Sequence, residues 1–172
     1  YMLVYSDKNL SITRYIESDF QTDRDDHKSI SGLVLTLGGG AIVWKSIKQS
    51  YVANSTMEAE YVAASEAAME AVWLKKFLAD LEVVPNMDKP IDLYCDNTGA
   101  IANVKESRHH KRTKHIEWRY HLIRSIVERG DVNMLKIASE NNPVDPFTKT
   151  LSARVFEKHL ESFGLKNMSH LR

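Results

Sequence analysis

Alternation of apolar and polar residues predicts a series of β-strands in the first third of the chain. Residues 12–20, 33–37 and 41–44 are short stretches rich in β-branched and aromatic side chains, which is typical of strands. The three glycines at 38–40 predict the turn between the last two strands. A glycine triplet can also cradle phosphate, but no Gly-Lys-Ser/Thr sequence follows, so the turn is the better interpretation.

A helical period replaces this alternation after Ser55. Ser55 and Glu58 have the spacing of a capping box, in which two side chains bind free backbone N–H groups at the start of a helix. Apolar residues then recur at helical spacing, and we interpret them as the core-facing stripe of a long helix. They are Val62, Met69, Trp73, Phe77 and Leu81.

The rest of the chain alternates between strands and helices. Changes of period between 2 and 3.6 predict strands at 91–96 and 132–138 and helices at 97–105, 116–127 and 152–164. The order is βββαβαβα, where the second α stands for a pair of helices, and it indicates the α/β class. We expect one domain over residues 11–165, an N-terminal connector at 1–10 and a C-terminal tail at 166–172.

Composition narrows the class of protein. The chain has 172 residues and zero formal net charge, which argues against a protein that coats nucleic acid through bulk charge. Its single cysteine excludes a disulfide framework and fits a reducing compartment. No apolar run approaches the roughly 20 residues of a membrane span, and no signal peptide opens the chain. We therefore expect an intracellular domain, cytoplasmic or nuclear, with no membrane partner, and interpret the chain as a module of a longer protein.

Positive charge is concentrated in one segment. Residues 107–115 have the sequence SRHHKRTKH, without an acid. Such a run is often only a solvated face, but it could also bind the phosphates of a nucleic acid, with Trp118 or Tyr120 nearby. The histidines lack a fourth ligand at any familiar zinc spacing. The candidate nucleic-acid ligands are Arg108, Lys111, Arg112, Lys114 and His115.

Four acidic residues that are far apart in the sequence have surroundings suited to metal binding. They are Glu17, Glu60, Asp96 and Asp145. Phosphodiester hydrolysis at neutral pH needs an activated water and a way to neutralise charge on the leaving oxygen. Carboxylates that hold two divalent cations provide both.

Four motifs together resemble the ribonuclease H domain of copia-type LTR retrotransposon Pol polyproteins. They are STMEAEY at 55–61, YCDN at 94–97, RTKHI at 112–116 and NPVDPFTK at 142–149. The likeness extends over about residues 10 to 165. It implies a ribonuclease H-like fold, with a mixed five-stranded sheet flanked by helices. It also implies a module that follows a reverse transcriptase, in a virus-like particle if the element is active.

The resemblance also implies an activity and its ligands. Such a domain cuts the RNA strand of RNA/DNA hybrids with two Mg²⁺ ions, which Mn²⁺ can replace, held by an Asp-Glu-Asp-Asp set. Asp96 and Asp145 match the third and fourth members, and Glu60 matches the second. Glu58 is its rival, but the capping box accounts for Glu58 better. Asp96 and Glu17 should bridge the two ions, while Glu60 and Asp145 complete the coordination shells of these ions.

The first position departs from the family pattern. The family usually has a run such as Gly-Tyr-Thr-Asp-Ser-Asp, and residues 14–19 here are Arg-Tyr-Ile-Glu-Ser-Asp, so Glu17 replaces an aspartate. Asp19 lies two residues on, on the same strand face, and is a second candidate. Asp7 is rejected because it precedes the first predicted strand. Glu140 is a weak candidate for assisting water or product transfer.

Two hypotheses of different classes follow. The first is a metal-dependent endoribonuclease acting on RNA/DNA hybrids, in which either the backbone accommodates the longer Glu17 or Glu17 weakens the activity. The alternative is a decayed or domesticated ribonuclease H-like module that binds nucleic acid or a protein partner without cleaving. A resolvase or transposase of the same fold is a distant third, because the motif at 142–149 argues against it.

Overall fold

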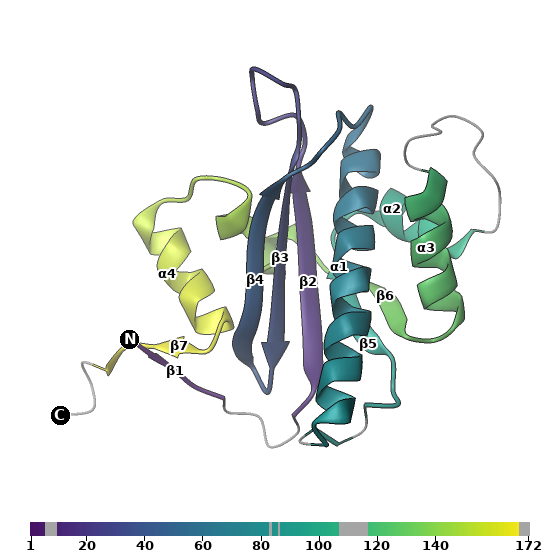
Figure 1. Ribbon diagram of the computed structural model, residues 1–172. Helices are drawn as coiled ribbons and strands as arrows, with labels where there is room; N and C mark the ends of the chain where they lie inside the picture. Colours follow the sequence, from purple (N-terminus) through teal and green to yellow (C-terminus); the bar gives the residue numbers. More distant parts are fainter. Residues whose placement is uncertain (6–9, 83, 86, 107–116, 169–172) are drawn as a thin grey trace.

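A mixed five-stranded sheet forms the centre of the computed structural model, which describes residues 1–5, 10–82, 84–85, 87–106 and 117–168 (Figure 1). The strands lie in the order β4-β3-β2-β5-β6. They span Ile12–Asp19 (β2), Ile30–Leu37 (β3), Gly40–Lys48 (β4), Ile91–Cys95 (β5) and Val132–Lys136 (β6). The first three are antiparallel, whereas β5 runs parallel to β2 and β6 parallel to β5. The predicted fold class is confirmed.

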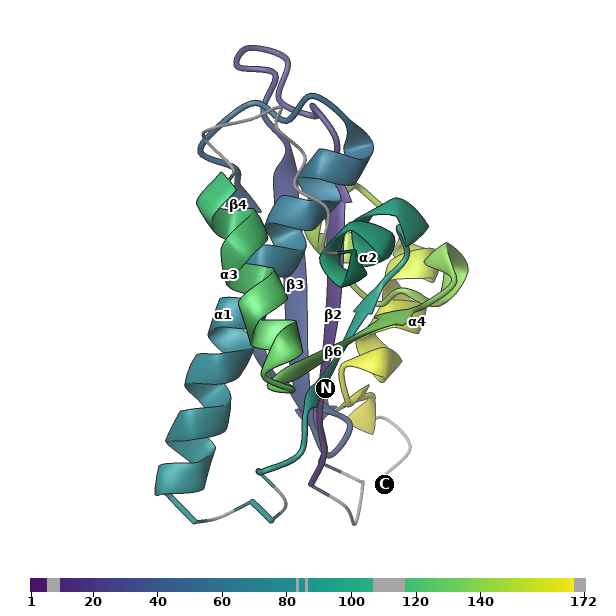
Figure 2. The same ribbon diagram turned by 90° about the vertical axis from the view of Figure 1, so that its right-hand side faces the viewer.

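Helices cover both faces of the sheet. They span Thr56–Asp80 (α1), Thr98–Lys105 (α2), Glu117–Glu128 (α3) and Ala153–Ser162 (α4), with short 3-10 turns at Ser139–Asn141 (η1) and Asp145–Phe147 (η2). Helices α1 and α3 lie on one side of the sheet and α4 on the other (Figure 2). The described helices include none with the length and apolar character required to cross a membrane.

The buried face of α1 differs from the predicted stripe. Val62 is fully buried, but Trp73, Phe77 and Leu81 are 58%, 46% and 50% exposed. The two aromatic rings stack on each other at the surface. The large apolar residues misled the prediction because alanines form much of the interface, where their small side chains let the helix approach the sheet closely. The buried alanines are Ala59, Ala63, Ala64, Ala67, Ala68 and Ala71.

The two ends of the described chain pair with each other. Strand β1 (Met2–Leu3) is antiparallel to β7 (Leu165–Lys166), and the N–H of Val4 donates to the carbonyl of Gly164. Residues 2–4 of the predicted connector therefore pair with residues 164–166, where the predicted C-terminal tail begins. The domain bounds at residues 11 and 165 stay a prediction.

An arginine is buried in the middle of β2. The side chain of Arg14 has no exposed surface, and its three guanidinium nitrogens have no hydrogen-bond partner. Its strand neighbours Ile12 and Ile16, two residues away on either side, belong to the main apolar core. Burial lowers the pKa of Arg14 to about 9, although the charge on Glu70 acts in the opposite direction. Since an unsatisfied buried charge is costly, Arg14 should destabilise the fold.

Replacement of this arginine by an apolar residue of similar length should therefore stabilise the protein. We expect Arg14→Met to raise the free energy of unfolding by about 1 to 4 kcal/mol, the range found when buried ionic groups are replaced by apolar ones. The measurement is urea unfolding at neutral pH. The control is Arg129→Met, at an exposed arginine paired with Asp131, where the change should stay within about 0.5 kcal/mol. A loss of stability in Arg14→Met would contradict the interpretation.

Candidate active site

The strand order brings the four predicted carboxylates to one end of the sheet. Glu17 lies two residues before the end of β2, and Asp96 directly follows β5. Because β2 and β5 are parallel neighbours, their carboxyl ends meet at the same edge of the sheet. Glu60 lies in the second turn of α1, and Asp145 begins η2. The site is therefore assembled from four separate elements.

Glu60 and Asp96 form the first half of the site, together with Cys95. One ligand atom from each of these three residues lies within 4.8 Å of the others. Glu60 Oε1 accepts a 2.7 Å hydrogen bond from the backbone N–H of Ser18, which fixes the helix carboxylate to β2. The Cys95 thiol donates to Glu60 Oε2 at 3.9 Å. Asp96 is not needed as the cap of α2, because the side chain of Asn97 caps this helix by accepting from the N–H of Ala100 at 3.0 Å.

Burial and crowding of like charge raise the pKa values in this half. Burial raises the pKa of Glu60 to about 8, and the charges on Asp96 and Glu17 act in the same direction, against the N–H of Ser18. Burial also raises the pKa of the Cys95 thiol to about 12, so Cys95 is a neutral donor at pH 7. The carboxylates are thus held where a cation would relieve their repulsion.

Glu17 and Asp145 form the second half, with a lysine between them. The ammonium of Lys149 lies 2.8 Å from Glu17 Oε1 and 3.0 Å from Asp145 Oδ1. The hydroxyl of Thr148 donates to Glu17 Oε2 at 3.0 Å. Glu17 and Asp145 are not part of the group that contains Cys95. The structure therefore divides the predicted acidic set into two pairs.

The second pair is also electrostatically strained. Burial raises the pKa of Glu17 to about 7, and interaction with Asp145 adds to this, while Lys149 opposes it. Burial favours the neutral amine of Lys149, yet its hydrogen bonds to Glu17 and Asp145 hold its pKa above the ordinary value. Lys149 is therefore a full positive charge between two crowded carboxyl groups.

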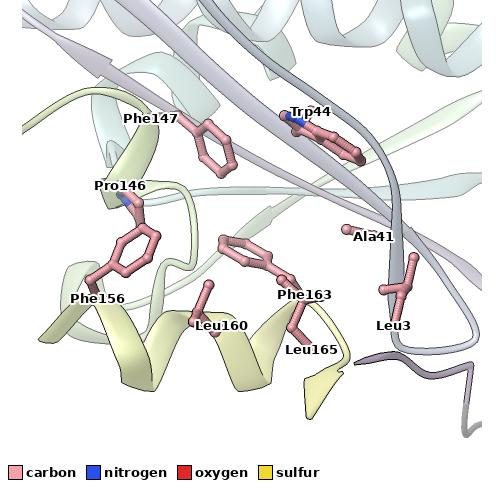
Figure 3. A pocket seen from close by; sticks show the side chains of 9 residues that line it. All are labelled: Leu3, Ala41, Trp44, Pro146, Phe147, Phe156, Leu160, Phe163 and Leu165. Carbon is pink, nitrogen blue, oxygen red and sulfur yellow. The ribbon is translucent and has the colours of Figure 1, made fainter. Parts of the chain in front are cut away.

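Contacts on the opposite face of the sheet from α1 fix the loop that carries Asp145. The side-chain amide of Asn142 donates to the carbonyl of Ile16 at 2.7 Å. Beyond Asp145, Pro146 and Phe147 line an apolar hollow of about 240 Å³ against α4 (Figure 3), where Phe147 packs edge-on against Phe163. None of the four predicted carboxylates lines this hollow, and its apolar walls pack the loop that carries Asp145 against α4.

Sequence reasoning missed the roles of Asn142, Thr148 and Lys149. All three lie in the 142–149 motif that was used for the resemblance, so the motif itself was the available signal. Their contacts depend on residues more than 120 positions away in the chain. Nothing in the local sequence showed these partners.

The secondary candidates lie outside both pairs. The carboxylate of Glu58 accepts from the N–H of Asn54 at 2.8 Å, and its own N–H donates to Ser55 Oγ at 3.1 Å, as a capping residue would. Asp19 is the last residue of β2, and Glu140 is exposed in η1. Asp7 lies outside the described residues, as do the basic candidates, whose role stays a prediction. The basic candidates are Arg108, Lys111, Arg112, Lys114 and His115.

The donor set fits hard divalent cations. Carboxylate oxygens are the ligands that Mg²⁺ and Mn²⁺ prefer, and Glu60 and Asp96 offer two such groups in close proximity. Between Glu17 and Asp145 a cation is already present as the Lys149 ammonium. Both halves of the site thus place carboxylates where they can bind a cation.

Comparison with known proteins identifies the relatives and the fold of the chain. No family model matches the chain. It is 43% identical over 151 residues to the retrovirus-related Pol polyprotein from transposon TNT 1-94 of Nicotiana tabacum, a match that covers 88% of this chain and 11% of the polyprotein. Among solved structures, the ribonuclease H1 LC11 isolated from compost superposes with a TM-score of 0.59 at 18% identity, over 88% of this chain and 99% of that one. The same enzyme in complex with an RNA/DNA hybrid gives a TM-score of 0.56 at 16% identity, over 80% and 94%.

The chain has the fold of a ribonuclease H-like domain. Its homologues are retrovirus-related Pol polyproteins of plant transposons. The chain spans about a tenth of the length of these relatives.

The raised carboxyl pKa values predict that the metal-free protein loses stability as pH rises. The folded protein keeps the protons of Glu17 and Glu60 up to about pH 7 and 8, whereas the unfolded chain releases them near pH 4.5. The contribution of these two protonated carboxyl groups to the stability of the fold is complete below about pH 4.5, and it is lost as pH rises through about 8. The urea midpoint in EDTA should therefore be lower near pH 8.5 than near pH 5.5, and saturating Mg²⁺ should reduce the difference.

Two variants check the assignment of this pH dependence. Glu60→Gln should flatten the profile in EDTA, because it removes the most perturbed carboxyl group. Glu157→Gln, at an exposed position in α4, should leave the profile as in the unmodified protein. If both variants keep the full pH dependence, another group is responsible for it.

Proposed function

We propose that this domain is a metal-dependent endoribonuclease that hydrolyses the RNA strand of RNA/DNA hybrids. The observation that carries the proposal is the convergence of Glu17, Glu60, Asp96 and Asp145 at one edge of a ribonuclease H-like sheet. Two further facts support it. The homologues are Pol polyproteins, and a protein of the same fold has been crystallised with an RNA/DNA hybrid.

The chemistry divides between the ions and the chain. Two Mg²⁺ ions, when bound, would activate the attacking water and neutralise charge on the leaving oxygen. Asp96 and Glu60 would hold metal in one half of the site, and Glu17 and Asp145 would hold it in the other. The N–H of Ser18 orients the Glu60 carboxylate, and the Asn142 amide holds the Asp145 loop against β2.

The proposed substrate and partners extend to the rest of the polyprotein. The basic residues between 108 and 115 would bind phosphates of the hybrid, and the reverse transcriptase portion of the same polyprotein would supply that hybrid. The proposed location is intracellular, cytoplasmic or nuclear.

A non-cleaving module is the second candidate, and one specific observation favours it. The carboxylate of Glu17 is engaged by Thr148 and Lys149 and lies outside the group formed by Glu60, Cys95 and Asp96. Glu17, one methylene longer than the aspartate of the family pattern, thus lies with Asp145 rather than with Glu60 and Asp96. Such a domain could still bind a hybrid, because phosphate contacts do not require the metal site.

The first test of the enzyme is the charge on Asp96. We expect Asp96→Asn to abolish Mg²⁺-dependent cleavage of a labelled RNA/DNA hybrid, because the negative charge of Asp96 would hold the metal in the Glu60 half of the site. Asp92→Asn is the matched control, since Asp92 lies on the same strand and its carboxylate only accepts from Asn133 at the surface. Full cleavage by Asp96→Asn would show that the site is assigned wrongly.

The second test is the length of the first ligand. Glu17→Asp should raise the cleavage rate about 10- to 100-fold, because a ligand displaced by about one ångström can cost roughly 100-fold. A shorter side chain keeps the carboxylate near the β2 backbone, where the N–H of Ser18 holds Glu60. Asp19→Asn should change the rate much less. Absence of cleavage in both the unmodified protein and Glu17→Asp would favour the non-cleaving module, and loss of activity only in Asp19→Asn would make Asp19 the ligand.

A further inference from the structure

Lys149 is the only residue among those described that forms ion pairs with two members of the predicted metal-ligand set. Its ammonium contacts Glu17 at 2.8 Å and Asp145 at 3.0 Å. The side chains of Glu17 and Asp145 are 9% and 21% exposed, whereas that of Lys149 is 44% exposed. The lysine therefore covers the carboxylate pair from the solvent side.

The turn that carries Asp145 holds Lys149 in this place. The N–H groups of Thr148 and Lys149 both donate to the carbonyl of Asp145, at 3.2 and 3.1 Å. The chain thus returns on itself and sets the side chains of Asp145 and Lys149 side by side. On the other side of the pair, the Thr148 hydroxyl fixes the second oxygen of Glu17. The contact between Lys149 and Asp145 is therefore fixed by the conformation of the local backbone.

A divalent ion and the Lys149 ammonium cannot share these carboxylates in the same way. Mg²⁺ requires oxygen ligands at about 2.0 to 2.1 Å, and an ammonium bonded to the same oxygens would place a like charge close to the ion. A lysine has a flexible four-carbon stem and a strongly hydrated head group. It can therefore leave toward solvent without any rearrangement of the fold.

We propose that Lys149 is a resident counter-cation that competes with divalent metal for Glu17 and Asp145, and so sets the metal concentration at which this half of the site fills. The inference rests on the proposed metal-dependent function. In the absence of metal, the ammonium compensates the two carboxyl groups. Metal binding displaces it, so that loading of the site and release of Lys149 are one coupled event.

Metal affinity of the whole chain tests the competition directly. Calorimetric titration with Mg²⁺ should show binding about tenfold tighter in Lys149→Met than in the unmodified protein, the scale on which groups beside metal ligands change affinity. Lys149→Arg, which keeps the charge, should not show this gain. Lys45→Met is the matched control, because Lys45 makes a 2.7 Å ion pair with Glu70 at similar exposure but outside the site, and it should bind Mg²⁺ as the unmodified protein does.

A second measurement needs no variant and so does not depend on the folding of Lys149→Met. The side-chain ammonium resonance of Lys149, followed by NMR in the unmodified protein, should shift and exchange faster with water as Mg²⁺ is added. That of Lys45 should stay unchanged.

The possible failures are distinguishable. Equal or weaker Mg²⁺ binding by Lys149→Met would overturn the proposal that Lys149 is a counter-cation, and so would a Lys149 resonance that does not change when metal binds. Neither result would contradict the proposed nuclease. Absence of Mg²⁺ binding by every protein, with no cleavage of hybrid, would overturn the metal site and the counter-cation with it.

Discussion

Close packing of helix α1 against strand β2 is the contact on which the candidate active site depends. The buried face of α1 is largely alanine, with Ala64, Ala67, Ala68 and Ala71 fully excluded from solvent. Because the distance between packed elements follows the size of the side chains between them, this interface lets the Glu60 carboxylate reach the N–H of Ser18 at 2.7 Å. A wider interface would leave Glu60 remote from the strand that carries Glu17.

The concentration of four carboxyl groups at one edge creates a repulsion that the metal-free fold must relieve. The two halves of the site do this differently. Glu60 retains a proton, as its pKa of about 8 indicates, whereas Glu17 and Asp145 share the Lys149 ammonium. The same crowding that is unfavourable without a cation would favour divalent metal. The electrostatic arrangement thus links the stability of the domain to its proposed chemistry.

Arg14 and Glu17 lie three positions apart on β2, and their side chains point to different faces of the sheet. Arg14 shares its face with the core residues Ile12 and Ile16, whereas Glu17 faces η2 and contacts Thr148. Successive residues of a strand point to opposite faces, so Arg14 bears on the packing of the core and Glu17 on the candidate metal site.

The sequence by itself determined the α/β class, the order of elements and the approximate bounds of most strands and helices, since periodicity and capping residues are local signals. It also made Asp96 and Asp145 candidate metal ligands, because both stand in recognisable motifs. Only the tertiary structure decided that alanines, and not Trp73 and Phe77, form the buried face of α1. It alone showed that the acids form two pairs and that Lys149 separates Glu17 from Asp145. These features depend on contacts between residues far apart in the chain, and no local pattern of residues encodes such contacts.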